Sequence, residues 1–426
     1  MKDQHLIVIG GGAAGFFCGV NAALENPDLH VTIIEKTSKL LSKVRVSGGG
    51  RCNVTHACFS IAEMIKKYPR GEKFLKQSFH HFFTTDTINW FEQKNIKLKT
   101  EEDGRMFPES NSSETIIACL LQEADRTGIK ILLHYEALEI IKSIKKGNTN
   151  NDSKSSNDGF IIQCKNGVTL SSDYICVACG GFSKKEHFNW LVKLGHTFEL
   201  PVPSLFTFNI PENPIVRLMG ITLKEVTIKI NGTHYKQSGP LLITHWGFSG
   251  PSVLKLSAFA AKALFEMQYK FSITVNWLPS INENIVLDKL KNLRHQLASQ
   301  KIGGRNPFNL PQRLWIYHLQ QCGVNEDTRW ADLPARLQNL LAIQLCAEQF
   351  NIIGKTTFKE EFVTAGGIKL NEVNAVTMQS KVVPHLFFAG EILDVDGITG
   401  GFNFQHAWTS GWLAANTISS ISKEPK

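Results

Sequence analysis

The 426-residue sequence contains no apolar run close to the roughly 18 to 20 residues that a membrane-spanning helix needs. Its first residues, MKDQH, lead directly into an apolar segment and lack the pattern of a secretory signal peptide. The nine cysteines are odd in number and scattered, which is typical of reduced thiols and not of a disulfide framework. These absences predict a cytoplasmic protein.

Several catalytic patterns are missing too. The sequence has no nucleophile elbow and no phosphate-binding P-loop. The tandem His80 and His81 have no partner at ligand spacing, so we predict no metal site. Cys176 and Cys179 form a Cys-x-x-Cys in an apolar run, where a β-strand would point them to opposite faces, so a redox pair is not expected there.

The composition, 42% hydrophobic and 20% charged, is typical of a globular protein, and the length predicts two or three domains. The formal net charge is +8, and part of it lies in a cluster after the first β-branched segments (Lys36, Lys39, Lys43, Arg45 and Arg51). Such a cluster can neutralise the phosphates of a cofactor and attract an anionic substrate, or it can be a solvated loop. The excess leaves nucleic-acid binding open.

A dinucleotide-binding pattern stands near the start of the chain. An apolar strand, residues 6–9, runs into Gly10-Gly11-Gly12-Ala13-Ala14-Gly15, and a helical segment and a second strand ending at Glu35 follow. Gly10 permits a sharp turn, Gly12 a close approach of the backbone to a pyrophosphate, and Gly15 close packing of helix on strand. Glu35 can accept hydrogen bonds from a ribose diol. The alternative is a glycine-rich turn that binds no ligand.

The far end of the chain favours FAD over NAD. A buried strand ends in Gly390-Glu391, and Gly400-Gly401-Phe402-Asn403-Phe404 opens the closing helix. In flavoproteins of the glutathione-reductase type, the acid holds the ribityl chain and the helix dipole stabilises negative charge on the reduced flavin. The alternative is a glycine-rich loop before an ordinary helix.

The pattern along the chain predicts three domains. We expect an FAD-binding domain of residues 1–195 and 361–426, an inserted β-rich domain of residues 196–280 and 348–360, and a nested helical domain of residues 281–347. Residues 145–158 are polar and of low complexity, and they are predicted to form a surface loop.

The chain resembles the BaiN-type, or YhiN-like, family of FAD-dependent oxidoreductases. The strings that carry the resemblance span nearly the whole chain and include Ser47-Gly48-Gly49-Gly50-Arg51-Cys52-Asn53, Thr244-His245-Trp246-Gly247-Phe248 and Ala389-Gly390-Glu391-Ile392-Leu393-Asp394. The resemblance implies an α/β fold of the glutathione-reductase type: a Rossmann-like FAD-binding domain, an inserted β domain and a nested small helical domain.

The resemblance also assigns site residues. It places Gly10, Gly12, Ala14 and Gly15 on the pyrophosphate of FAD, Glu35 and Lys36 at the adenosine ribose, and Ala137 against the adenine. It places Arg51 and Asn53 at the phosphates or the flavin, Gly390 and Glu391 at the ribityl chain and phosphate, and Phe402, Asn403 and Phe404 at the isoalloxazine edge. Cys52 lacks a second cysteine at redox spacing and is expected to be a packed thiol.

The predicted function is that of an FAD-dependent oxidoreductase in which hydride passes through flavin N5. His245 is the candidate proton donor; alternatively it is hydrogen-bonded within a turn. No second dinucleotide motif occurs, so NAD(P)H docks transiently at the flavin or another donor replaces it. The preferred substrate is a small, apolar, unsaturated molecule. A flavin-dependent RNA-modifying enzyme and a non-catalytic flavin-binding sensor remain alternatives.

Overall fold

A computed structural model describes residues 4–145, 157–356 and 363–423. The chain forms two compact units: Met1–Pro203 with Lys359–Lys426, and Ser204–Phe358. The centre of the predicted surface loop, residues 146–156, lies outside the described residues. The division into three domains stays a prediction. No helix in the described part of the chain combines the length and apolar character that crossing a membrane requires.

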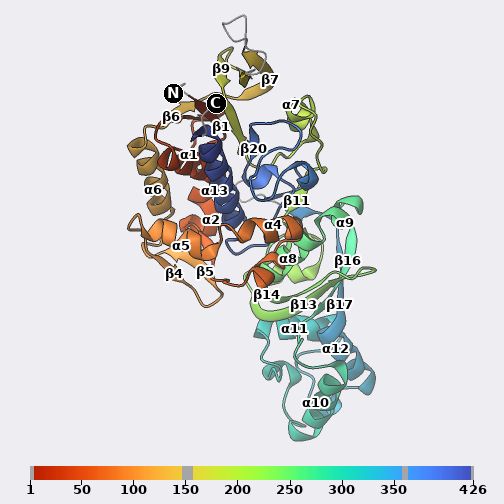
Figure 1. The fold of residues 1–426 in the computed structure, drawn as a ribbon. Coiled ribbons are helices and arrows are strands. Elements are labelled where there is room, and N and C mark those ends of the chain that lie inside the picture. Colours follow the sequence, from red (N-terminus) through yellow and green to blue (C-terminus); the bar gives the residue numbers. More distant parts are fainter. Residues whose placement is uncertain (1–3, 146–156, 357–362, 424–426) are drawn as a thin grey trace, which may run out of the picture. The chain divides into compact units, whose positions relative to one another are not determined.

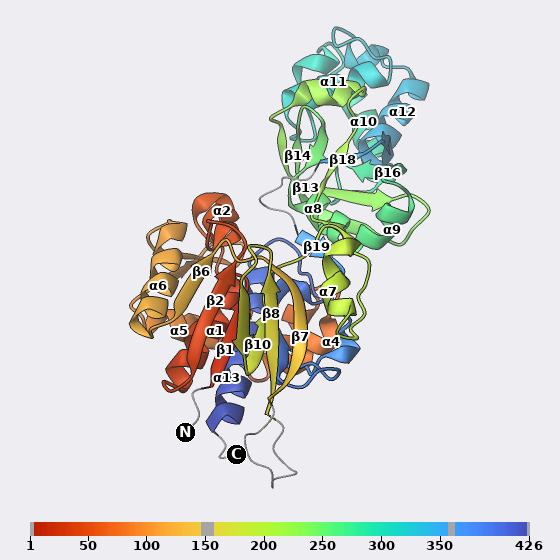
Figure 2. The same ribbon diagram turned by 90° about the horizontal axis from the view of Figure 1, so that it is seen from above.

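The first unit is built on a five-stranded parallel sheet. Its strand order is β20 (Leu386–Phe388), β10 (Tyr174–Val177), β1 (His5–Ile9), β2 (His30–Glu35) and β6 (Lys130–Leu133). All four pairings are parallel, and Figure 2 shows β6, β2, β1 and β10 side by side. The near-continuous apolar runs of β1, β10 and β20 fit strands buried on both faces. The predicted α/β class with a Rossmann-like parallel sheet is confirmed.

The first and last helices of the chain, α1 (Ala13–Glu25) and α13 (Phe402–Lys423), pack against each other (Figure 1). Gly411 allows this close approach, because a Cβ there would lie 2.7 Å from the carbonyl oxygen of Ala14. The Ser419 hydroxyl donates to the carbonyl oxygen of Ala22 over 3.1 Å. The two ends of the chain therefore share one core.

Smaller elements complete the first unit. Two three-stranded sheets have the orders β3-β5-β4 and β7-β8-β9, and β11 pairs with β19. The strands are β3 (Thr55–His56), β4 (Leu98–Thr100), β5 (Arg105–Pro108), β7 (Ala137–Lys145), β8 (Asn157–Cys164), β9 (Thr169–Ser172), β11 (Val202–Ser204) and β19 (Val363–Ala365). The helices are α2 (Ser42–Gly50), α3 (Ile61–Ile65), α4 (Glu72–Phe79), α5 (Thr84–Glu92), α6 (Ser113–Arg126) and α7 (Asn189–Val192).

The second unit contains a seven-stranded antiparallel sheet. Its order is β17 (Glu348–Ile352), β16 (Phe271–Asn276), β13 (Thr222–Ile230), β14 (Lys236–Ile243), β15 (Gly247–Ser249), β12 (Thr207–Asn209) and β18 (Lys355–Thr356). Helices α8 (Pro251–Phe259) and α9 (Ala261–Glu266) precede β16, and α10 (Glu283–Gln296), α11 (Gln312–Gln321) and α12 (Ala335–Ala347) lie between β16 and β17.

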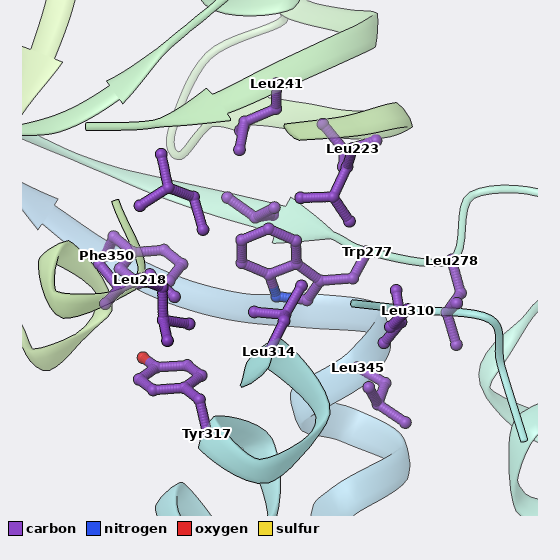
Figure 3. Packing of buried hydrophobic residues seen from close by; sticks show 14 of the residues in the cluster. Leu218, Leu223, Leu241, Trp277, Leu278, Leu310, Leu314, Tyr317, Leu345 and Phe350 are labelled. Atoms are coloured by element: carbon purple, nitrogen blue, oxygen red, sulfur yellow. The ribbon is translucent and has the colours of Figure 1, made fainter. Parts of the chain in front are cut away.

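The sheet and the helices of the second unit share one apolar core. Figure 3 shows Trp277 between Leu314 of α11 and strands of the sheet, with Leu345 of α12 and Phe350 of β17 nearby. Helices α10–α12 bury their apolar faces in this shared core, so they belong to the same compact unit as the sheet.

A carboxyl group lies inside this core. Glu348 is only 5% exposed, and its two oxygens accept hydrogen bonds from Trp277 Nε1 over 2.6 Å and from the Tyr317 hydroxyl over 2.8 Å. Burial raises the pKa of Glu348 to about 8, which exceeds the opposing effect of the two donors. His318 Nδ1 lies 3.7 Å from the carboxyl group, and burial lowers the pKa of His318 to about 3. Both side chains are therefore uncharged in the core near neutral pH.

We expect these two groups to limit the stability of the second unit at both ends of the pH range. Between pH 4.5 and 8 folded Glu348 holds a proton that the unfolded chain has lost, so the free energy of unfolding falls as pH rises. Between pH 6.5 and 3 His318 gains a proton in the unfolded chain but not in the folded one. The free energy of unfolding therefore falls as pH drops through this range. From pH 4.5 to 6.5 the two slopes oppose each other.

The substitution Glu348→Gln should remove the alkaline slope, which is about 2–4 kcal/mol between pH 5.5 and 8 in the wild type. Hydrogen exchange measured at several pH values, and corrected for intrinsic exchange rates, reports this pH dependence of local stability in peptides from β16, α11 and β17. Glu283→Gln, at an exposed position of α10, is the matched control and should keep the wild-type slope. An unchanged slope in the Glu348 variant would show that this carboxyl group does not titrate as described.

Candidate dinucleotide site

The turn between β1 and α1 has two glycines that packing requires. A Cβ on Gly10 would lie 2.4 Å from the carbonyl oxygen of Ala178, and a Cβ on Gly15 would lie 1.9 Å from that of Gly10. Gly12 differs, because a Cβ there would meet no atom within 4 Å. Gly12 is also the N-cap of α1 and provides no side-chain cap, so no side chain of the N-cap residue satisfies the first N–H groups of the helix. An anion fits this position.

Glu35 is fixed beside this turn at the end of β2. Its Oε2 accepts a hydrogen bond from the backbone N–H of Gly11 over 3.0 Å, and its Oε1 accepts from the N–H of Thr37 over 2.9 Å. A carboxylate has about four acceptor positions, so capacity remains for a hydroxyl group. The neighbouring Lys36 side chain is exposed.

A cavity of about 260 Å³ opens next to Glu35. Its lining includes Gly10, Glu35, Lys36 and Ala137, together with the apolar side chains of Leu138, Phe182 and Trp190. An apolar wall with charged side chains at its edge, Glu35 and Lys36 among them, suits a planar base attached to a sugar. The volume fits the nucleoside end of a dinucleotide and not the whole molecule.

The turn after β20 lies against the first turn of α1. Gly390 has a φ of +75°, and a Cβ there would lie 2.8 Å from the Cβ of Ala14. Helix α13 holds this turn, because the Gly390 N–H donates to the Ser410 hydroxyl over 2.8 Å and His406 Nε2 lies 3.2 Å from the Gly390 carbonyl oxygen. Burial lowers the pKa of His406 to about 4, so the imidazole is neutral.

Glu391 extends this turn. It accepts a hydrogen bond from the Thr364 N–H over 2.8 Å and pairs with the ammonium group of Lys43. The Lys43 side chain is half exposed, whereas that of Glu391 is 16% exposed. An acid and a base from opposite ends of the chain thus meet beside the glycine turns.

The start of α13 is tied to the segment after α2. With its amide oriented to satisfy both contacts, Asn53 accepts from the Gly401 N–H over 3.0 Å and donates to the Thr55 carbonyl oxygen over 3.1 Å. A Cβ on Gly401 would lie 2.5 Å from that same oxygen of Thr55, so only glycine fits.

The predicted flavin-edge side chains have partners within the protein. The Asn403 amide exchanges two hydrogen bonds with the backbone of Gly397, over 2.7 and 2.9 Å. Phe402 is buried and stacks on His56 with ring centroids 4.6 Å apart, and Phe404 lies nearly parallel to Trp408 at 5.8 Å. These contacts fix the helix start, so backbone N–H groups of its first turn are what α13 can offer an electron-rich ring.

Arg51 forms contacts that its sequence neighbours do not reveal. Its guanidinium pairs with Glu101 over 2.5 Å and lies 4.0 Å from the centre of the Phe107 ring. The adjacent Cys52 thiol is fully buried, as expected, and burial raises its pKa to about 12. The Arg51 charge is therefore already partly neutralised.

His245 belongs to the second unit. It lies exposed in the turn between β14 and β15, with its ring centroid 4.2 Å from that of Trp246. Its role as a proton donor stays a prediction. The other predicted site residues all belong to the first unit.

Three residues that position the site were not predicted, namely Thr364, His406 and Ser410, and the pairing of Lys43 with Glu391 was not predicted either. Thr364 stands in a glycine-rich string, Val363-Thr364-Ala365-Gly366-Gly367, that could have pointed to it. His406 and Ser410 are four residues apart on one helix face, a spacing that could have indicated a shared target.

The chain is similar to known proteins over nearly its full length. The family described as HI0933-like protein Rossmann domain matches residues 4–417. A ribosomal RNA dihydrouridine synthase of Escherichia coli (strain K12) is 29% identical, with 98% of both chains covered. A protein with the same name from Haemophilus influenzae is 30% identical, covering 97% of this chain and 98% of that one. A 3-dehydro-bile acid delta(4,6)-reductase of Clostridium scindens is 27% identical, with 96% and 97% covered.

Solved structures show the same fold at low sequence identity. A flavocytochrome c3 fumarate reductase matches with a TM-score of 0.50 and 15% identity, covering 99% of this chain and 79% of that one. A 3-ketosteroid delta1-dehydrogenase of Sterolibacterium denitrificans matches with a TM-score of 0.50 and 13% identity, covering 98% and 99%. Family and fold support FAD as the cofactor. The match over residues 4–417 shows that the chain belongs to the HI0933-like Rossmann family of flavoprotein oxidoreductases.

Proposed function

We propose that FAD binds along the glycine turns of the first unit. The open space at Gly12, in front of uncapped N–H groups, takes the pyrophosphate, with Gly10, Ala14 and Gly15 shaping the turn. Glu35 and Lys36 hold the adenosine ribose, and Ala137 packs against the adenine in the cavity beside them.

The remaining assignments follow the chain from the phosphates to the ring. Glu391, next to Gly390 and paired with Lys43, accepts a ribityl hydroxyl. Arg51 and Asn53 act near the phosphates or the flavin. Phe402, Asn403 and Phe404 place the first turn of α13 at the isoalloxazine edge.

We further propose that the protein reduces a carbon–carbon double bond conjugated to a carbonyl group. A dihydrouridine differs from a uridine by two hydrogens across such a bond, and a 3-dehydro-bile acid with delta(4,6) unsaturation carries the same conjugated unit. The names of both kinds of relative therefore describe one chemistry. The reduced form of FAD would supply the hydride and return to the oxidised form.

The charge distribution favours a uracil base of ribosomal RNA as the substrate. The second unit holds sixteen Lys and Arg against nine Asp and Glu, a net charge of +7 out of +8 for the chain. A small apolar substrate gives no reason for this concentration of positive charge, whereas a polyphosphate backbone does. This observation carries the choice of RNA over a small unsaturated acid.

The reaction also needs an electron donor for the flavin and a proton donor for the substrate. NAD(P)H docks transiently and reduces the flavin, since the chain has one dinucleotide motif. The second hydrogen added to the double bond is a proton, and His245 is the proposed donor because its imidazole is exposed.

The holoprotein should convert uridine to dihydrouridine in an unmodified ribosomal RNA transcript when NADPH or NADH is supplied without oxygen. Mass spectrometry of nucleosides detects the product, and flavin absorbance reports reduction by each nicotinamide. A 3-keto bile acid with conjugated double bonds is tested in parallel. Reduction of the bile acid but not of the RNA would overturn the RNA assignment, and a flavin that neither nicotinamide reduces would refute an NAD(P)H-dependent reductase.

Two glycine variants should separate folding from cofactor binding. Gly12→Ala adds a methyl group to open space, so the apoprotein should lose no more than about 1 kcal/mol of stability while FAD affinity falls at least ~10-fold. Gly15→Ala forces a methyl group against the Gly10 carbonyl and should cost about 2–3 kcal/mol in the apoprotein.

Urea unfolding of the apoprotein and titration with FAD, followed by flavin fluorescence, measure both effects. Gly304→Ala is the control, since a Cβ there also meets open space but lies in the second unit. Wild-type FAD affinity in the Gly12 variant would refute the proposed pyrophosphate position.

A further inference from the structure

One exposed face of the sheet in the second unit is polar and basic over four neighbouring strands. On the buried face, Ile228, Ile273 and Phe350 point into the core. The alternate residues point outward, where Lys229 and Lys236 are exposed and Thr227 and Thr274 are half-buried. Period-two alternation of this kind makes one face of an antiparallel sheet apolar and the other solvated.

The two lysines are direct neighbours. Lys229 of β13 is paired in register with Lys236 of β14, and the same row continues through Thr274 of β16 to Gln349 of β17. Like charges directly opposite each other on adjacent strands are destabilising. Among the described residues no ion pair joins either ammonium group to a carboxylate. An anionic partner would offset this repulsion.

The next row supplies hydroxyl groups. Thr227 lies opposite Ser238, and their oxygens are 2.7 Å apart. Both rows are free of carboxylates; the nearest acid along β13, Glu225, lies in the bulge that interrupts the register. Lysine, hydroxyl and amide groups are the donors that proteins use for phosphate and sugar oxygens.

The composition of these rows decides between kinds of partner. They contain no aromatic or large apolar side chain, which a protein interface would need as an anchor and a membrane surface as an inserting group. None of the nine acids of the unit lies in these rows, so no carboxylate there opposes an anion. A flexible polyanion fits best.

We propose that the lysine face, defined as Lys229, Lys236, Thr227, Ser238, Thr274 and Gln349, binds the sugar–phosphate backbone of the RNA substrate. The proposal rests on the proposed function and adds the surface that holds the RNA. Because the donors face phosphates and not base edges, the lysine face supplies affinity and orientation without reading sequence.

The test compares a double variant of the lysine face with a charge-conserving variant at the same positions and with a control that loses two lysines elsewhere in the second unit, all as holoprotein. In Lys229→Gln/Lys236→Gln, binding of a fluorescein-labelled oligouridine, followed by anisotropy, should weaken about 10-fold at 0.1 M KCl. The slope of log Kd against log salt should fall by about 1.4, which corresponds to two lost phosphate contacts. Lys229→Arg/Lys236→Arg should keep wild-type binding. Lys291→Gln/Lys301→Gln should also do so, because those lysines already pair with Asp288 and Asp327.

The outcomes separate this proposal from the proposed function. Suppose that the lysine-face variant binds oligouridine with the wild-type affinity and the wild-type salt dependence, while the wild type forms dihydrouridine. The lysine face is then not the RNA-binding surface, and the proposed function stands. If the wild type reduces only the bile acid and does not bind oligouridine, both fail. Loss of binding to phosphatidylserine vesicles with unchanged RNA binding would assign the face to a lipid surface and overturn the proposal.

Discussion

The structure depends on the contact between the first and last helices of the chain. Gly411 lets the backbone of α13 approach Ala14, and Gly390 also lies against Ala14, so three small residues bring the two glycine turns close together. Larger side chains would move the turns apart. The chain must therefore leave the first unit and return to it, and the exit strand β11 and the return strand β19 pair with each other. The Ser204–Phe358 unit is consequently an insertion and not a terminal domain.

This arrangement separates two tasks that have different electrostatic needs. The first unit has thirty Lys and Arg against twenty-nine Asp and Glu, so it is nearly neutral, and its anion-binding capacity comes from helix N–H groups and a few local charges. The second unit carries nearly all of the net positive charge. A cofactor held by backbone geometry does not need a charged domain around it, and a flexible polyanion does.

The sequence predicted those features that glycine and strand order determine. Gly10, Gly15 and Gly401 stand where no side chain fits, and such positions leave a local signature. Partners distant in sequence leave none: nothing near Arg51 indicates Glu101, and nothing near Glu391 indicates Lys43. Asn403 is predicted at the flavin edge, and the sequence did not indicate that its amide holds the backbone of Gly397, a local contact that short polar side chains form readily. Glu348 alternates with apolar residues as an inward position of β17, but only the folded core shows the tryptophan and tyrosine that satisfy it.

The difference between a nucleobase and a steroid-like acid need not be made by the cofactor site. Both substrates present a flat conjugated unit, and relatives with both kinds of name align with this chain over nearly its whole length. Discrimination requires a group that contacts one substrate and is idle or unfavourable with the other. The glycine turns cannot supply it if, as proposed, they hold FAD and not the substrate. The opposed lysines of β13 and β14 can, since they carry a repulsion that a polyphosphate offsets and a single carboxylate offsets only in part. On this proposal, substrate choice is a property of the inserted unit.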